Sequence, residues 1–301
     1  MIRLLALALA VLLAGCSANE APAPSAPSDD APQFRRLSSS PEAEVAPRFS
    51  PDGAQLVYER AGGLRVMDVA TRTSRVLVPQ GNHPSWTSDG SAVVFVRRDI
   101  APAGLIHRLM RVALATGALD TLSADSVDAY EPAASPTSAA IVLRQLSRVS
   151  RRQTLRVVDA SGATLEVLAE AGPYVDSTPA WSRDGASIAF VRVEASGAGR
   201  LMVVPANGSA AASMLRAAGD LVADPAWMAD GRVAYARAGT ISWIAPGDAS
   251  VHVLVEGDGF ELAPALSNDG TRLAFTSDRT GNRELWMLDA PGGIGAGPYR
   301  Y

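Results

Sequence analysis

The sequence is poor in the side chains on which many reactive sites depend. Its 301 residues include one cysteine, Cys16, three histidines and no lysine, so all 27 basic side chains are arginines. A single cysteine excludes an intramolecular disulfide or a thiolate metal cluster, and packing must supply the stability. We interpret the absence of lysine as a coding bias. The formal net charge is -4, whereas nucleic-acid-binding proteins typically carry an excess of basic residues. We therefore expect no nucleic-acid partner.

The sequence also lacks an apolar run long enough to span a bilayer. Arg3 is followed by ten consecutive Leu, Ala and Val residues at 4–13, whereas a transmembrane helix needs about 20 apolar residues. A basic residue, a short apolar core and small residues are typical of a cleaved secretion signal. The alternative is a buried first helix of a globular domain, but such a helix would carry polar residues on one face. We therefore expect residues 1–15 to be a signal peptide.

The residues after this run predict a lipid anchor. The segment LAGC at 13–16 resembles the lipobox of bacterial lipoproteins, and the resemblance implies that Cys16 becomes the lipidated, palmitate-bearing first residue. Ser17 replaces the aspartate that retains lipoproteins at the inner membrane in familiar Gram-negative sorting, so we expect outer-membrane anchoring facing the periplasm. Residues 16–32 are rich in Ala, Pro and Ser without apolar periodicity, which predicts a disordered tether of up to roughly 50 Å.

One segment recurs along the rest of the chain. A clear copy is TPAWSRDGASIAFVRV at 178–193, and a degraded copy at 131–145 has lost the Asp-Gly pair. The spacings between successive repeat prolines, 37, 48, 47, 46 and 39 residues, match the length of a four-stranded propeller blade. The six repeat prolines are Pro47, Pro84, Pro132, Pro179, Pro225 and Pro264.

Each repeat predicts a small antiparallel sheet. In five copies Asp-Gly stands between two alternating apolar runs, which is a strong hairpin signal because the tight turn needs positive φ. A third strand and usually a short fourth strand follow, and no helical periodicity occurs outside the signal segment. The sequence therefore predicts an all-β, six-bladed β-propeller over residues 33–290.

The last repeat lacks a fourth strand of its own. LWMLDA at 285–290 runs directly into a Gly-rich segment, so we expect residues 291–301 to form a flexible tail. QFRRLS at 33–38 precedes the first repeat and has the pattern of an outer strand. We therefore expect this N-terminal strand to complete the last blade and close the ring, which removes the open sheet edges.

The repeats resemble those of the TolB-type six-bladed propellers. The resemblance rests on Pro-x-Trp-Ser-x-Asp-Gly before an Ile-Ala-Phe strand and on SDRTGNRELWMLD at 277–289, and it covers residues 33 to about 290. It implies binding to proteins of the Tol-Pal system in the cell envelope. Related propellers also occur in some polysaccharide lyases and attached to serine peptidases, so fold alone does not identify function. TolB carries a separate N-terminal domain where this sequence has a tether, so we do not identify it as TolB itself.

The side chains two residues after each repeat proline are mostly large and apolar. We interpret them as packing between neighbouring blades, where aromatic side chains dominate burial, in preference to a ligand-stacking platform. Truncation of Trp181 is accordingly expected to cost about 3–5 kcal/mol of stability. The set consists of Phe49, Trp86, Ala134, Trp181, Trp227 and Leu266.

A mostly acidic set precedes the prolines by one or three positions, which would place it on one face of each innermost strand. Such a ring at one channel mouth predicts binding of a basic peptide segment or of a cation such as Ca²⁺. The alternative is that these side chains cap loop amides. The predicted channel-mouth residues are Glu44, His83, Glu131, Asp176, Asp224 and Glu261.

Signals for catalysis are few. The sequence has no Gly-x-Ser-x-Gly segment and no His-x-x-x-His pair, and His107 and His252 fall in expected strands. We assign no catalytic residue and no cofactor other than the Ca²⁺ considered above. The predicted function is a lipid-anchored, monomeric, non-catalytic scaffold or adaptor that presents its channel mouth to an envelope protein or peptide. The alternatives are an envelope polysaccharide lyase or hydrolase with a channel site, and a sensor or orphan scaffold.

Overall fold

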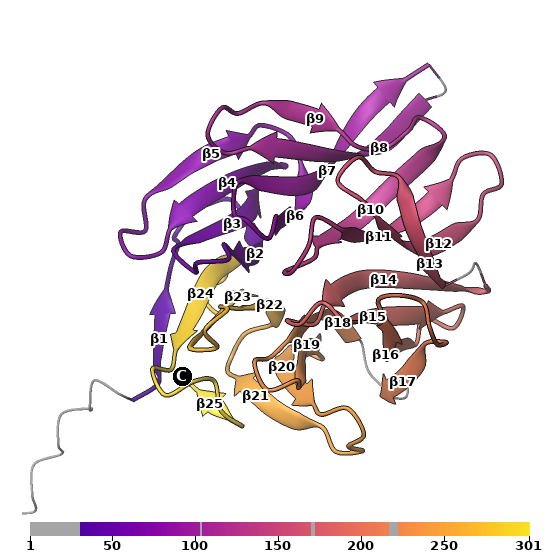
Figure 1. Cartoon of the computed structure of the whole chain (residues 1–301). Helices are drawn as coiled ribbons and strands as arrows, with labels where there is room; N and C mark the ends of the chain where they lie inside the picture. The colour runs from indigo at the N-terminus through magenta and orange to yellow at the C-terminus, as the bar shows by residue number, and fades with distance from the viewer. Residues whose placement is uncertain (1–30, 103, 170–171, 217–221) are drawn as a thin grey trace, which may run out of the picture.

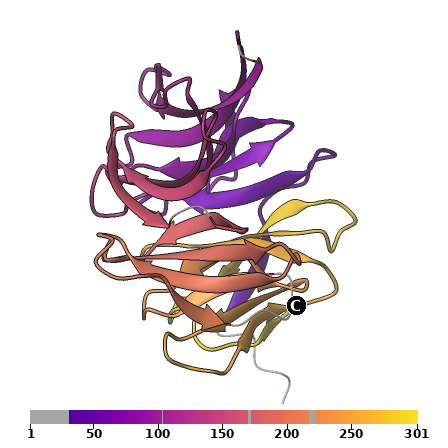
Figure 2. The same cartoon turned by 90° about the vertical axis from the view of Figure 1, so that its right-hand side faces the viewer.

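Six sheets built from antiparallel hairpins surround a central axis, as the sequence predicted (Figure 1). The structure is a computed structural model that describes residues 31–301 apart from 103, 170–171 and 217–221. Its described residues form 25 strands and no helix. Figure 2 shows the ring from the side, with blades 1–3 in indigo to pink and blades 4–6 in orange to yellow. The chain is therefore an all-β, six-bladed propeller.

Three strands of every blade come from one sequence repeat. The innermost strands are β2 (Glu44–Phe49), β6 (Asn82–Trp86), β10 (Val127–Ala134), β14 (Tyr174–Trp181), β18 (Val222–Trp227) and β22 (Glu261–Leu266). The second strands are β3 (Gln55–Arg60), β7 (Ala92–Ala101), β11 (Ile141–Ser147), β15 (Ser187–Glu194), β19 (Val233–Arg237) and β23 (Arg272–Ser277). The third strands are β4 (Gly63–Asp68), β8 (Gly104–Ala113), β12 (Gln153–Val158), β16 (Gly199–Pro205), β20 (Thr240–Ile244) and β24 (Glu284–Asp289). The outer strands of blades 1–5 are β5 (Ser74–Val78), β9 (Leu119–Thr121), β13 (Thr164–Ala169), β17 (Ser213–Arg216) and β21 (His252–Glu256).

The Asp-Gly turns are encoded locally. In blade 1, Gly53 has φ of 69°, and Asp52 accepts a hydrogen bond from the backbone N–H of Ala54 at 3.0 Å. Positive φ costs glycine little, and a short carboxylate readily caps its own turn. Blade 3 lacks Asp-Gly, and there the Ser135 hydroxyl accepts from the N–H of Thr137 at 3.3 Å. A hydroxyl-capped turn thus preserves the hairpin in the degraded repeat.

The N-terminal strand completes the last blade, which confirms the predicted closure. β1 (Gln33–Arg36) pairs antiparallel with β24, and Phe34 lies opposite Leu288 (Figure 1). The next residue, Leu37, is 4% exposed and packs in the cluster between blades 6 and 1. Blade 6 therefore joins the two ends of the propeller through backbone pairing and apolar burial.

The expectation of a flexible C-terminal tail is wrong. β25 (Tyr299–Arg300) pairs in parallel with β21 and adds a fifth strand to blade 5. Ile294 is 8% exposed and packs in the cluster between blades 5 and 6, and the Tyr301 hydroxyl donates a hydrogen bond to Glu261. The burial of Ile294, the hydrogen bond of Tyr301 and a short pairing segment hold these residues although the tail is rich in glycine. Composition alone did not show that a docking site existed.

The hydrophobic core is distributed between neighbouring blades. Each of six clusters joins two adjacent sheets, such as the one in which Trp86 and Phe95 of blade 2 meet Leu64 of blade 1. The indole N–H of Trp86 donates to the Arg48 carbonyl at 3.0 Å. Trp181 and Trp227 make the same hydrogen bond to the preceding blade. The tryptophans therefore pack between blades, as the sequence predicted.

The predicted signal peptide and the lipidation site Cys16 lie outside the described residues. In the part of the chain that the structure describes, no helix is long and apolar enough to cross a membrane.

Candidate functional site

A cavity of about 470 Å³ occupies the centre of the ring. The innermost strands of all six blades line it, and its wall is largely proline, alanine and tryptophan with a small number of charged side chains. Pockets of this size that combine apolar walls with polar groups are typical of ligand-binding sites. The central cavity is therefore the candidate site.

A backbone irregularity at the same place in every blade shapes this cavity. The residue before each repeat proline has positive φ, between 47° and 54°, although none of the six is glycine. Each innermost strand also has a register shift there, so that two of its residues lie opposite one residue of the second strand. This is a β-bulge, which re-aims side chains and interrupts the alternation of a strand. We call the six residues the bulge ring, and they are Ala46, His83, Glu131, Thr178, Asp224 and Ala263.

The bulge corrects the predicted ring of six channel-mouth residues. Glu44, Asp176 and Glu261 stand three positions before their prolines, and they do not line the central cavity. They are 2%, 7% and 0% exposed. The expectation that they share a face with the residues next to the proline assumed unbroken strand alternation, and the bulge breaks it.

These three carboxylates are instead held by arginines of their own blades. Asp176 accepts two hydrogen bonds from Arg192, at 2.7 and 2.8 Å. The Arg279 guanidinium lies 3.4 Å from Glu261, and Arg60 and Glu44 lie 3.6 Å apart. Buried carboxylates require such partners, so these pairs are structural.

His83, Glu131 and Asp224 do line the cavity. The Glu131 carboxylate accepts from the N–H of Thr178 at 2.9 Å, and Asp224 accepts from the N–H of Ala263. Each carboxylate thus accepts a hydrogen bond from the backbone N–H of the bulge-ring residue in the following blade. The structure here matches the amide-capping alternative considered for these residues.

The described residues contain no group of three His, Cys, Asp or Glu side chains that could hold a metal ion together. The binding of Ca²⁺ therefore stays a prediction, and the cavity offers charged groups for other ligands.

The pKa of Asp224 is raised above its ordinary value. Burial is the main cause, and the negative charge of Glu131 adds to it. Arg48, His83 and the hydrogen bond from Ala263 act in the opposite direction without cancelling the shift. The ionised Asp224 is thus held at a cost to the folded state.

We expect Asp224→Asn to raise the thermal unfolding midpoint at pH 8. Because the folded pKa lies above the unfolded value, ionisation of Asp224 lowers stability at pH values above the folded pKa. This cost vanishes as the pH falls below the unfolded value, so the gain should shrink towards pH 4. Calorimetric melts across this pH range measure it.

Asp184→Asn is the matched control, because hydrogen bonds from Ser182 and Ala186 lower the pKa of that exposed aspartate. It should leave the midpoint unchanged or lower it at pH 8. A lower midpoint for Asp224→Asn than for wild type at pH 8 would contradict the assignment.

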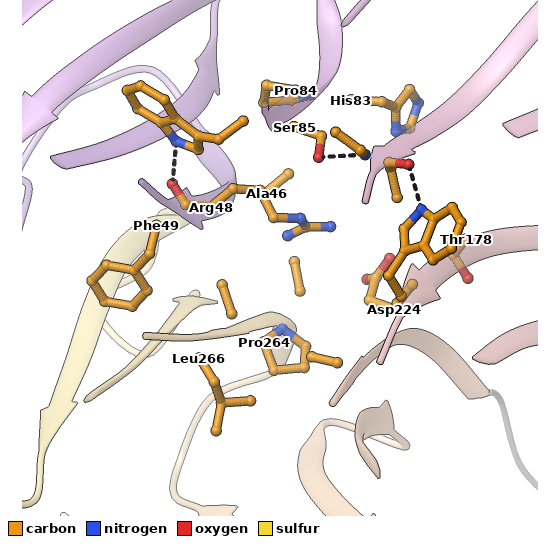
Figure 3. A pocket seen from close by; sticks show the side chains of 18 of the residues that line it. Ala46, Arg48, Phe49, His83, Pro84, Ser85, Thr178, Asp224, Pro264 and Leu266 are labelled. Carbon is orange, nitrogen blue, oxygen red and sulfur yellow. Dashed lines mark hydrogen bonds between the residues drawn. The ribbon is translucent and has the colours of Figure 1, made fainter. Parts of the chain in front are cut away.

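Arg48 is a cavity residue that the sequence analysis missed. It follows the repeat proline of blade 1, where the other five blades carry Ser85, Ala133, Ala180, Ala226 and Ala265. Figure 3 shows its guanidinium extending into the middle of the cavity. Comparison of the residues after the six prolines would have found it, because one large cation stands among small side chains.

The guanidinium of Arg48 forms no close ion pair within the described protein. The guanidinium donates one hydrogen bond among the described residues, to the Pro47 carbonyl at 2.8 Å. No described carboxylate lies within 4.0 Å of the guanidinium. Burial lowers the pKa of Arg48 below its ordinary value, although Asp224 and Glu59 act to raise it. Most of its N–H groups therefore face the cavity.

Arg183 crosses the end of the cavity at which the Asp-Gly turns lie. Its guanidinium, from blade 4, donates to the carbonyls of Ser267 and Asn268 in blade 6. Arg183 and Asn268 both line the cavity.

Comparisons with known proteins agree with this architecture. The family described as the TolB beta propeller domain matches residues 30–236. A protein TolB homolog of Chlorobium luteolum is 30% identical over 119 residues, which are 38% of this chain and 27% of that protein. The chain thus matches about a quarter of the length of that relative.

Among the solved structures that are similar in fold at low identity are a regucalcin and an oligogalacturonate lyase. Regucalcin of Agrobacterium tumefaciens, described as a calcium-binding protein, has a TM-score of 0.63 at 20% identity, over 89% of this chain and 96% of that one. Oligogalacturonate lyase of Vibrio parahaemolyticus has a TM-score of 0.60 at 14% identity, over 86% and 81%. At such identities the likeness shows the fold alone. The family match covers more than half of the sequence and six blades are present, so the chain belongs to the TolB beta propeller domain family.

Proposed function

We propose that this protein is a lipid-anchored, non-catalytic scaffold or adaptor of the cell envelope that binds a protein or peptide partner at its central cavity. The observation that carries the proposal is the cavity itself, of about 470 Å³ and lined by all six blades. Its wall of apolar and polar side chains and its inward-pointing Arg48 suit an inserted peptide segment. Membership of the TolB propeller family supports a protein partner.

The charged groups of the cavity favour binding over catalysis. Glu59 and Glu131 each accept a hydrogen bond from a backbone N–H, so their carboxylates are engaged in the fold. The Ser85 hydroxyl accepts from the N–H of Ala134 at 3.0 Å, and no histidine pairs with it among the described hydrogen bonds. Ser85 therefore lacks the adjacent base that activates a nucleophile, and the hydroxyls of Ser50 and Thr87, which also line the cavity, donate to the turn carboxylates Asp52 and Asp89.

We further propose that the anchor is the lipid on Cys16, that the protein is a monomer, and that it faces the periplasm from the outer membrane. Support comes from the LAGC segment and from Ser17 after it. Mass spectrometry of the N-terminal peptide should show a lipid-modified Cys16 and no residues 1–15. An unmodified peptide, or retention of the signal residues, would refute the anchor.

Photo-crosslinking in cells tests the binding function. A photoreactive amino acid at position 83, on the cavity wall, should capture one discrete envelope protein. The matched control is position 76, because Val76 is 55% exposed on β5 at the outer side of the same ring. Equal crosslinks from both positions would refute binding at the cavity, and turnover of oligosaccharide or peptide by the purified protein would favour the enzyme alternative.

A further inference from the structure

Of the six residues that directly follow the repeat prolines, only one has a large side chain. Five blades contribute alanine or serine there, and blade 1 contributes Arg48. The small neighbours leave the space into which the guanidinium extends (Figure 3). A residue needed only to fill the ring would have matched its neighbours in size, so the arginine indicates a specific contact.

Arg48 can donate far more hydrogen bonds than the fold uses. A guanidinium has five N–H donors, and the described structure shows one hydrogen bond, to the carbonyl of Pro47. Asp224 and Glu59 act on this charge, but neither carboxylate forms a close ion pair with the guanidinium. The same fork of N–H groups binds carboxylates and phosphates in bidentate geometry, so the site is prepared for an anionic group.

The cavity lining also includes Arg183, which donates to carbonyls of blade 6, and Arg283. The carboxylates of the lining select among the anions that Arg48 can bind. Glu59, Glu131 and Asp224 line the same cavity, and their negative charges oppose a dianion more strongly than a monoanion. A single carboxylate on an apolar body also suits the proline and tryptophan wall. The anion favoured by these surroundings is therefore a carboxylate.

We propose that Arg48 binds a carboxylate of the ligand in the central cavity, and that the partner therefore presents a peptide segment bearing a free C-terminus or an acidic side chain. This inference rests on the proposed function, because it names the chemistry of the segment that the cavity accepts. The contact requires one carboxylate to reach the middle of the ring, beyond the bulge ring.

Titration calorimetry with the full, detergent-purified chain tests the proposal. The probes are acetyl-Ala-Ala-Ala with a free C-terminus, the same peptide as its amide, the amide of acetyl-Ala-Asp-Ala, and inorganic phosphate. Saturable binding of either carboxylate peptide, with none of the amidated trialanine, is expected, and the two acids distinguish a terminal from a side-chain source. Equal binding of the amide, preference for phosphate, or no saturable binding would overturn the proposal.

The matched variants are Arg48→Met and Arg75→Gln. Arg48→Met should weaken carboxylate binding at least tenfold. Arg75→Gln removes the same charge from an exposed position on β5 in the same blade and should bind as wild type does. Unchanged affinity in Arg48→Met would refute the contact.

Arg48→Ala tests whether a loss of binding comes from a loss of fold. We expect this variant to fold, because four other blades carry alanine at this place. The hydrogen bond from Trp86 goes to the backbone carbonyl of Arg48 and survives the substitution. Its unfolding midpoint should be no lower than that of wild type, and its carboxylate binding should be lost. Carboxylate binding retained by Arg48→Ala would also overturn the proposal.

The two proposals can fail separately. Capture of a partner at position 83 without carboxylate binding would leave the proposed function standing and remove the role of Arg48. Carboxylate binding through Arg48 without a captured protein would support the contact and count against the protein-binding function.

Discussion

Deletion of residues 33–38 from the full chain is expected to lower the thermal unfolding midpoint by about 10 °C or more. The deletion removes β1 and its four-residue pairing with β24, so the edge of blade 6 is left open. It also removes Phe34, which packs against Phe275, and the buried Leu37. Burial of each such side chain contributes about 1.5–3 kcal/mol, which makes this loss large for one short segment.

The unfolding transition of the deletion variant should also broaden, because the ring no longer joins its first and last repeats. Calorimetry and circular dichroism measure both effects. Arg35→Gln is the matched control. It keeps the strand and loses only a half-exposed ion pair with Asp289, which is worth about 0–1 kcal/mol. An unchanged melting curve for the deletion would show that β1 does not close the ring.

Trp86→Ala is expected to reduce the free energy of unfolding by about 3–5 kcal/mol. Trp86 is 7% exposed and packs against Val57 and Leu64 of the preceding blade and Phe95 of its own. The substitution opens a cavity at this blade interface and also leaves the Arg48 carbonyl without its indole donor. Chemical denaturation measures the change.

Two further variants separate the causes of this loss. Trp86→Phe keeps much of the apolar contact and removes the indole donor, so it should cost about 1–3 kcal/mol. Leu165→Ala truncates a side chain that is 58% exposed and should change stability by about 0.5 kcal/mol or less. If Trp86→Ala costs no more than Leu165→Ala, the tryptophan does not hold the blades together.

The repeat architecture was predictable from local signals. Proline spacing, Asp-Gly turns and alternating apolar runs each depend on residues close in sequence, and hairpin geometry follows from them. The closing strand β1 was also predictable, because one repeat lacked an outer strand and one unassigned segment had the right pattern. These features needed no knowledge of side-chain contacts across the ring.

The candidate site was predicted only in part. His83, Glu131 and Asp224 line the cavity, whereas Glu44, Asp176 and Glu261 form ion pairs within their blades. The difference comes from the bulge before each proline. The residue type at this position does not predict the bulge, because Ala, His, Glu, Thr and Asp all occupy it with positive φ.

The surroundings of Arg48 and the docking of the C-terminal strand could not be predicted from the sequence, because both depend on contacts between distant residues. The sequence contained the odd residue at the position after the proline, but only the ring brought it together with Asp224 and Glu59. The Gly-rich tail lacked a strand pattern, yet β21 offered it an edge and Glu261 offered an acceptor for Tyr301.

The number of blades, their hairpins and the strand that closes the ring follow from local periodicity and turn chemistry. Tertiary structure alone decided which charges face the cavity, which are paired within blades, and where the tail docks. The reason is physical: side-chain direction changes at each bulge, and electrostatic partners are brought together by the ring from residues far apart in the chain.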